Sequence, residues 1–421
     1  MIRTEFLLFP LFCCVMALMI FGYPLQFLTL FEIPVFFYLL LLVPFLVIDP
    51  KENSIKKVDL TTFIILINLV LMLFLHYEDF YKIISFRDAS QNICMFFYIL
   101  GFYFFSSNNI KFLKNNHFNS LVSKLIIICF LSYLIHFFFN ELSININSKN
   151  INLFFITTIF SSLIIFLFIK IIKNFINENY LTKFLVPFYF FLIFCLIFLL
   201  QSRGIYIVVI LLLLILFFLY FKVIYYLPHL FTLFLVSIFL LSYFNFSGRL
   251  DINLSLTNLY NHFLTIFGVY NSDFKGSLGG LTQRYEWWIE NFRLSSMSLE
   301  YILIGRGYGF PLTDDLALAR VPIREVHNSF LSVYFRFGLF GIFLLLIIFW
   351  RLFFTWKRAI FLIRKKSEFS LFYFLFVAYT VVVIISSIAQ DAFEKIYYAI
   401  PFYFIFGITS RLINNEYPDY S

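Results

Sequence analysis

The chain has 421 residues, of which 62% are hydrophobic and only 13% are charged, and its formal net charge at pH 7 is +8. A soluble protein has about half apolar and about a quarter charged residues, so this composition excludes a water-soluble globule and indicates a polytopic membrane protein. In such a protein, lysine and arginine in short loops often set the orientation in the membrane, so the positive charge alone does not indicate nucleic-acid binding.

Apolar runs of roughly 17–25 residues recur along the chain, and this is the length a helix needs to cross a ~30 Å hydrocarbon core. We therefore predict an all-α membrane protein with about twelve transmembrane helices. In chain order, these helices are expected at residues 6–30, 33–48, 59–76, 92–106, 122–139, 152–172, 183–200, 205–222, 227–245, 329–352, 369–390 and 397–412.

The basic residues gather in one set of alternate connections, which predicts the orientation of these helices. The basic-rich set comprises Lys51, Lys56, Lys57, Lys111, Lys114, Lys124, Lys170, Lys173, Lys183, Lys222, Arg351, Lys357, Arg358, Arg364, Lys365 and Lys366. The opposite set of short loops has only Lys82, Arg87, Lys149, Arg203 and Lys395. Positive residues remain on the cytoplasmic side, so both termini are expected in the cytoplasm and the long polar insertion on the outer face. With no organelle-targeting pattern, we expect a bacterial inner membrane and a periplasmic insertion.

The polar insertion divides the chain into three regions. Residues 1–245 are expected to form an N-terminal transmembrane bundle, residues 246–327 a periplasmic loop, and residues 328–421 the C-terminal transmembrane helices. A connection longer than about 15 residues is uncommon unless it is functional or disordered, so we expect the exposed chemistry of the protein in this loop.

Within the loop, the segment GGLTQRYEWWIENFRLSSM predicts an amphipathic helix. Tyr285, Trp288 and Phe292 share one face at helical spacing. Tryptophan and tyrosine favour the headgroup region of a bilayer, so this helix is expected to lie on the membrane surface.

Three arginines are candidates for binding phosphate, because a guanidinium group stays charged and matches phosphate oxygens with its planar fork. Arg284 lies on the predicted surface helix, and Arg306 lies in the glycine-flanked turn GRGYG. Each has a plainer alternative: Arg284 as a solvated arginine or one resting on the indole of Trp288, and Arg306 as part of an ordinary turn. Arg203, between two apolar runs, is equally explained as an anchor at the membrane surface.

Two further arginines flank the start of the tenth predicted helix. Arg336 lies inside that helix, where a charge at membrane depth is costly and often marks function, although it could extend outward to the headgroups instead. Arg324 has the plainer role of offsetting Asp314, Asp315 and Glu325.

His327 is expected at the outer edge of the bilayer, at the start of the tenth helix and within reach of several arginines. Neutral imidazole can accept a proton near neutral pH, so His327 is a candidate general base. Asn328 and Ser329 can cap the helix, which explains their presence structurally. No cluster of histidine, cysteine and carboxylate residues has the spacing of a metal site, so we expect no metal and no other cofactor.

These residues resemble a known family. His327-Asn328, nine intervening residues and then Gly338-Leu-Phe-Gly341 fit the histidine–glycine pattern of O-antigen ligases, and ligase-like O-antigen polymerases share much of it. SRG with Arg203, QRYEWW with Arg284 and LIGRGYGF with Arg306 follow in family order. The resemblance covers about residues 180–350, whereas the first 180 residues are similar only as a bundle of helices.

The resemblance implies a helical, GT-C-like glycosyltransferase that moves an undecaprenyl-diphosphate-linked glycan at the periplasmic face, without a nucleotide sugar or metal. It implies that Arg203 and Arg284 bind the diphosphate and that His327 activates an acceptor hydroxyl. Arg306, Arg336, Arg324 and Asn328 are supporting candidates. The acceptor is lipid A–core oligosaccharide in a ligase and a second lipid-linked repeat unit in a polymerase, and the sequence leaves both open while favouring the ligase.

Two other classes stay open. A flippase or other transporter also needs basic residues along a cavity, but no internal repeat is visible and the ionisable groups gather at one face rather than at the midplane. A scaffold in an envelope complex would need neither the histidine nor the arginines beside it. Replacement of His327 separates these classes from an enzyme.

Overall fold

A computed structural model describes most, but not all, of the chain. The described residues are 9, 12–20, 60–75, 94–104, 111–138, 143–146, 149–152, 156–177, 185–200, 203–221, 223, 227–243, 275–307, 312, 326–389, 392–393 and 395–416. The predicted helix at 33–48 and Arg324 lie outside them.

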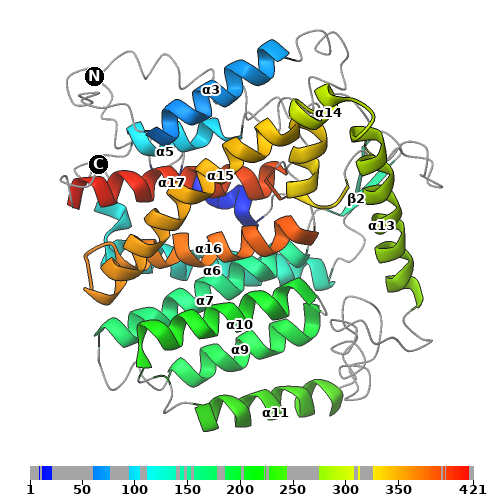
Figure 1. The fold of residues 1–421 in the computed structure, drawn as a ribbon. Coiled ribbons are helices and arrows are strands. Elements are labelled where there is room, and N and C mark those ends of the chain that lie inside the picture. The colour runs from blue at the N-terminus through cyan, green and yellow to red at the C-terminus, as the bar shows by residue number, and fades with distance from the viewer. Residues whose placement is uncertain are drawn as a thin grey trace. The chain divides into compact units, whose positions relative to one another are not determined.

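The described part is dominated by helices (Figure 1). Beyond a helical segment at residues 12–20 and a 3₁₀ turn at Lys111–Leu113, they are α3 (Leu60–Leu75), α5 (Phe96–Phe104), α6 (Asn115–Phe138), α7 (Ile156–Asn177), α9 (Leu185–Leu200), α10 (Arg203–Leu219), α11 (Leu227–Tyr243), α13 (Lys275–Ser295), α14 (Leu299–Leu303), α15 (Ser329–Arg364), α16 (Ser370–Ala389) and α17 (Ile396–Glu416). The prediction of a helical protein is confirmed.

One small element departs from the all-α prediction. The strands β1 (Ser143–Ile146) and β2 (Lys149–Asn152) pair antiparallel, with Ser143 opposite Asn152. The residues of β1 alternate between polar and apolar, and this period of two favours a strand over a helix.

Several helices are long and apolar enough to cross a membrane. Among the described residues, three reach full length: Ile159–Ile176, Ser329–Arg364 and Ser370–Ile388. Leu185–Ile197, Gly204–Leu219 and Pro228–Leu240 are shorter apolar helices. The chain is therefore a helical membrane protein, while the number of about twelve spans stays a prediction.

Two helices are longer than their apolar windows predicted. α6 begins at Asn115 rather than near residue 122, and α15 continues to Arg364 rather than ending near residue 352. Both extensions are rich in polar or basic residues, such as Asn116, Lys357 and Arg358. A hydropathy window detects only the apolar part of a helix, whereas the backbone hydrogen bonds continue past it.

The described chain divides into two compact units, each built from separate stretches of sequence. Unit 1 comprises Met1–Lys111, Gly280–Arg358 and Ser386–Ser421, and unit 2 comprises Phe112–Gly279 and Ala359–Ile385. These units are a division by contacts, so the three sequential regions expected from the polar loop stay a prediction.

In unit 1, α5 and α17 pack side by side through two glycines (Figure 1). A Cβ on Gly101 would meet the backbone carbonyl of Phe404, and one on Gly407 would lie 2.9 Å from the amide nitrogen of Phe102. Glycine at both positions lets the two helix backbones approach closely, which is common between transmembrane helices.

In unit 2, α6, α7, α9 and α11 pack as neighbours in chain order. Lys170 of α7 is only 9% exposed and joins α7 to α6, because its ammonium donates to the carbonyl oxygen of Asn119 at 3.0 Å and to its side-chain oxygen at 2.7 Å. The three donors of an ammonium group account for a buried lysine among neutral acceptors.

Candidate functional site

The site lies in unit 1 at the start of α15, where Asn328 caps the helix. Its side-chain oxygen accepts hydrogen bonds from the amides of Phe330 at 3.0 Å and Leu331 at 3.1 Å. These amides have no partner within the helix, which is why asparagine stabilises this position. Ser329 has a different role, since its hydroxyl accepts from the amide of Phe393 at 3.2 Å. The predicted cap is confirmed for Asn328.

His327, directly before the cap, has an unusual backbone conformation. Its φ is +55°, in the left-handed region that few residues other than glycine adopt without cost. The cap at Asn328 holds the chain on one side. On the other side the indole nitrogen of Trp288 donates to the carbonyl oxygen of Val326 at 2.9 Å. The half-buried imidazole is therefore fixed between two anchored residues.

The helix α13 supplies one wall of the site. Trp287, Asn291 and Ser295 recur every fourth residue and are all at most 2% exposed, so they form its buried face. Trp288 packs against Leu312, Val326 and Phe335. The predicted helix is confirmed.

The apolar face predicted for α13 is partly exposed and partly packed against other parts of the protein. Tyr285 is 61% exposed, whereas Trp288 packs inward and the ring of Phe292 lies 5.0 Å from that of Phe335. Trp288 therefore contributes to packing inside the protein, and the position of the helix on the membrane surface stays a prediction.

The turn at Gly305–Gly307 joins the site to α15 through backbone contacts. Gly305 and Gly307 have φ of +83° and +81°, which glycine adopts readily. The amide of Arg306 donates to the carbonyl oxygen of Phe335 at 3.0 Å, and the amide of Gly307 donates to that of Arg336 at 2.9 Å.

The carbonyl groups of Phe335 and Arg336, which accept these two hydrogen bonds, lie just before a break in α15. Gly338 has φ +61° and ψ −157°, a conformation essentially restricted to glycine, and it interrupts the helix. A Cβ on Gly338 would lie 2.6 Å from the amide nitrogen of Ile304. The glycines of GRG and Gly338 therefore form one close backbone junction, which the sequence analysis treated as two separate motifs.

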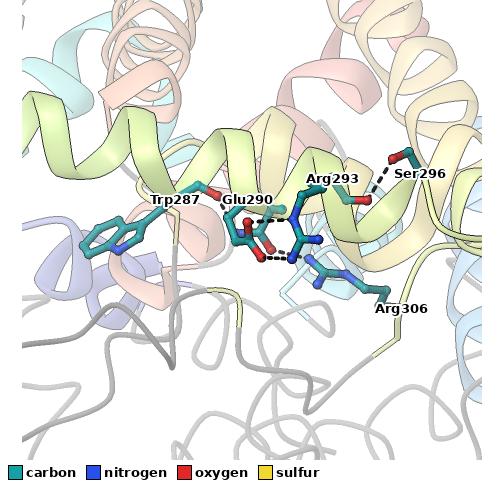
Figure 2. A network of polar contacts seen from close by, with 6 residues as sticks. Trp287, Glu290, Arg293, Ser296 and Arg306 are labelled. Atoms are coloured by element: carbon teal, nitrogen blue, oxygen red, sulfur yellow. Dashed lines mark hydrogen bonds and ion pairs between the residues drawn. The ribbon is translucent and has the colours of Figure 1, made fainter.

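Arg306 points from this turn to α13. It is 9% exposed, and its guanidinium donates a hydrogen bond to the side-chain oxygen of Asn291 and lies 5.9 Å from the ring centroid of Phe335. Figure 2 shows Arg306 facing the same stretch of α13 as the exposed ion pair of Glu290 with Arg293. Burial lowers the pKa of Arg306 to about 10, so it remains a cation at neutral pH. The turn thus presents a fixed positive charge.

Arg336 is the largest fully buried side chain of the described residues, at 1% exposed. The alternative in which it extends outward to the membrane surface is therefore wrong, because the side chain is enclosed by protein. A second buried cation two residues before Gly338 requires stabilisation by neighbouring groups, which is typical of a functional region in a membrane protein.

The two remaining arginines belong to different units. Arg284 is half-buried on α13, one turn before Trp287 and Trp288. Arg203 begins α10 in unit 2, so its partnership with His327 stays a prediction. In unit 1, His327 therefore lies beside Trp287 of α13 and Arg306 contacts Asn291 of the same helix, whereas Arg336 lies in α15 two residues before Gly338.

Sequence reasoning missed two residues of this region, Trp287 and Asn291. Asn291 binds Arg306, and its amide also donates to the carbonyl oxygens of Trp287 at 2.7 Å and Leu312 at 2.5 Å. The signal was a polar residue four positions after a tryptophan on the same helix face. Asn291 does not belong to the helix face that Tyr285, Trp288 and Phe292 define.

Long apolar helices, together with a fixed imidazole and two buried arginines in one compact unit, define a helical membrane protein with a charged site. Residues 188–346 match the model of the O-antigen ligase family, so this segment of the chain is similar to that family. The match confirms the resemblance carried by His327-Asn328 and Gly338, and it supports an O-antigen ligase or polymerase type of function in polysaccharide biosynthesis. Neither the curated proteins nor the solved structures contain a match to the chain.

Proposed function

We propose that the protein is a glycosyltransferase of a bacterial inner membrane that moves an undecaprenyl-diphosphate-linked glycan onto a hydroxyl group of lipid A–core oligosaccharide at the periplasmic face. The observation that carries this proposal is the site at the start of α15, where anchored His327 lies in one unit with the buried cation Arg306. The family match over residues 188–346 supports the chemical class.

In the proposed reaction, the imidazole of His327 takes the proton from the acceptor hydroxyl while that oxygen attacks the anomeric carbon of the donor sugar. The bond between this carbon and the diphosphate oxygen breaks, and undecaprenyl diphosphate leaves with the electron pair. A single in-line displacement inverts the anomeric configuration. Arg203 and Arg284 bind the diphosphate, and fixed cations stabilise the charge that develops on it. The chain's own groups supply the base and the positive charge, so the proposed reaction requires no metal or other cofactor.

Arg306 and Arg336 have a supporting role in this proposal. Arg306 is held by Asn291 and its turn is joined to α15, so its charge has a fixed position. A preorganised charge needs no reorientation as the reaction proceeds, which makes it more effective than a mobile one.

The sharpest test replaces His327 with asparagine. Asparagine tolerates the left-handed backbone conformation at this position better than alanine does, and it cannot act as a base. His327→Asn should lower the rate of glycan transfer by about 100-fold to 10,000-fold, which is the usual contribution of a general base. The exposed His117 of α6 provides the control, and His117→Asn should retain activity.

Transfer at the normal rate by folded His327→Asn protein would contradict the proposed base. Complementation separates the two acceptors. Restoration of long-chain lipopolysaccharide in a ligase-deficient strain supports the ligase, whereas extension of single repeat units in a polymerase-deficient strain would identify the polymerase instead.

A further inference from the structure

Two adjacent tryptophans of α13 differ in what their indole groups bind. The indole nitrogen of Trp288 donates to the carbonyl oxygen of Val326, as described above. Trp287 is only 2% exposed, and within the structure as described its indole nitrogen has no hydrogen-bond partner. An indole N–H group can only donate, so a buried one without an acceptor lowers the stability of the fold.

The indole ring of Trp287 lies next to His327. Its ring centroid lies 6.1 Å from that of His327, with the two planes inclined by 37°. Its backbone is fixed, because its carbonyl oxygen accepts from the side chain of Asn291 at 2.7 Å. Figure 2 shows the indole ring pointing away from the Glu290–Arg293 pair and from Arg306. The indole ring is therefore held beside the imidazole and directed away from the charged residues of α13.

We propose that the indole N–H of Trp287 binds an oxygen atom of the acceptor sugar, next to the hydroxyl group that His327 deprotonates. This inference rests on the proposed function and adds a specificity residue to it. A neutral donor on an apolar ring suits a neutral sugar, which offers both hydroxyl oxygens and apolar C–H surface. The charged diphosphate is better matched by arginine side chains.

The experiment compares Trp287→Phe with Trp288→Phe in the purified full-length protein. Phenylalanine keeps an aromatic ring and removes only the N–H donor and part of the ring. The substrates are an undecaprenyl-diphosphate-linked repeat unit as donor and lipid A–core oligosaccharide as acceptor, with a second lipid-linked repeat unit as the alternative acceptor. The KM of each substrate and the thermal unfolding temperature are measured for every variant.

Trp287→Phe should raise the acceptor KM about threefold to tenfold, the loss expected for one neutral hydrogen bond, and should leave the donor KM and the unfolding temperature unchanged. Trp288→Phe should lower the unfolding temperature, because it leaves the carbonyl of Val326 without that donor. An unchanged acceptor KM, a raised donor KM alone, or a fall in unfolding temperature equal to that of Trp288→Phe would each overturn the inference.

The test also separates this inference from the proposed function. If His327→Asn is inactive but Trp287→Phe has a normal acceptor KM, only the role of Trp287 fails. If His327→Asn retains full transfer activity, the proposed base fails first, and the role of Trp287 fails with it.

Discussion

Replacement of Gly338 by alanine should destabilise the protein strongly. Its φ of +61° and ψ of −157° cost a residue with a Cβ about 1–3 kcal/mol. The new methyl group would also overlap the backbone at Leu303 and Ile304, with the amide nitrogen of Ile304 only 2.6 Å away. The backbone atoms of a packed turn cannot move far enough to relieve this overlap. Overpacking of this kind costs about another 1–3 kcal/mol. The two effects add to about 2–6 kcal/mol, a large part of a typical stability of about 5–15 kcal/mol.

Thermal unfolding of the purified protein in detergent measures this loss, and Gly204 provides the matched control. Gly204 lies in α10, and among the described residues a Cβ there would meet the side chain of Ile385, at an ordinary contact distance of 3.9 Å. Gly204→Ala should leave stability unchanged or raise it by about 0.5–1 kcal/mol, because alanine favours a helix. Equal unfolding temperatures for Gly338→Ala and the unchanged protein would refute the close junction between α15 and the turn.

Three further predictions concern the polar site, the helix contact and the orientation. Asn291→Leu removes a hydrogen bond to the charged Arg306 and should cost about 1.5–3 kcal/mol in unfolding free energy, whereas exposed Ser296→Ala should cost little. Gly407→Val should lower the unfolding temperature through a clash between α17 and α5, and a normal temperature would argue against the close approach of these helices. In a cysteine-free background, Ser296→Cys should react with a membrane-impermeant maleimide on intact spheroplasts and Lys366→Cys only after lysis, and the reverse pattern would overturn the predicted orientation.

The helices were predictable from the sequence wherever a continuous run of apolar residues marks them. α9, α10, α11 and α16 begin and end within about three residues of the predicted ranges, because a run of apolar residues is both the signal and the structure. The polar end of α6 and the hairpin at Ser143–Asn152 were missed for the same reason, since neither is marked by hydropathy over a window of membrane-spanning length.

The candidate site was predictable in its residue types but not in its contacts. His327 and Asn328 stand at the start of α15 as the sequence indicated. In contrast, the pairing of Arg306 with Asn291 joins residues on separate elements, and no spacing rule predicts it. The sequence did not predict whether Arg336 is buried. A charged group near a membrane surface can be stabilised either by extending outward to the headgroups or by polar groups of the protein that enclose it.

The spacing between His327 and Gly338 has a physical meaning in this structure. The nine residues between Asn328 and Gly338 form a helical segment about 14 Å long, capped at one end and broken at the other. The imidazole is fixed at the capped end, and the backbone junction with the Arg306 turn lies at the broken end. One additional residue in this segment would rotate the two ends by about 100° relative to each other, since a helix has about 3.6 residues per turn. The fixed spacing therefore sets the direction of His327 relative to the buried cation Arg306, and this relation must be kept if the two residues act on one substrate as the proposed base and charge-stabilising group.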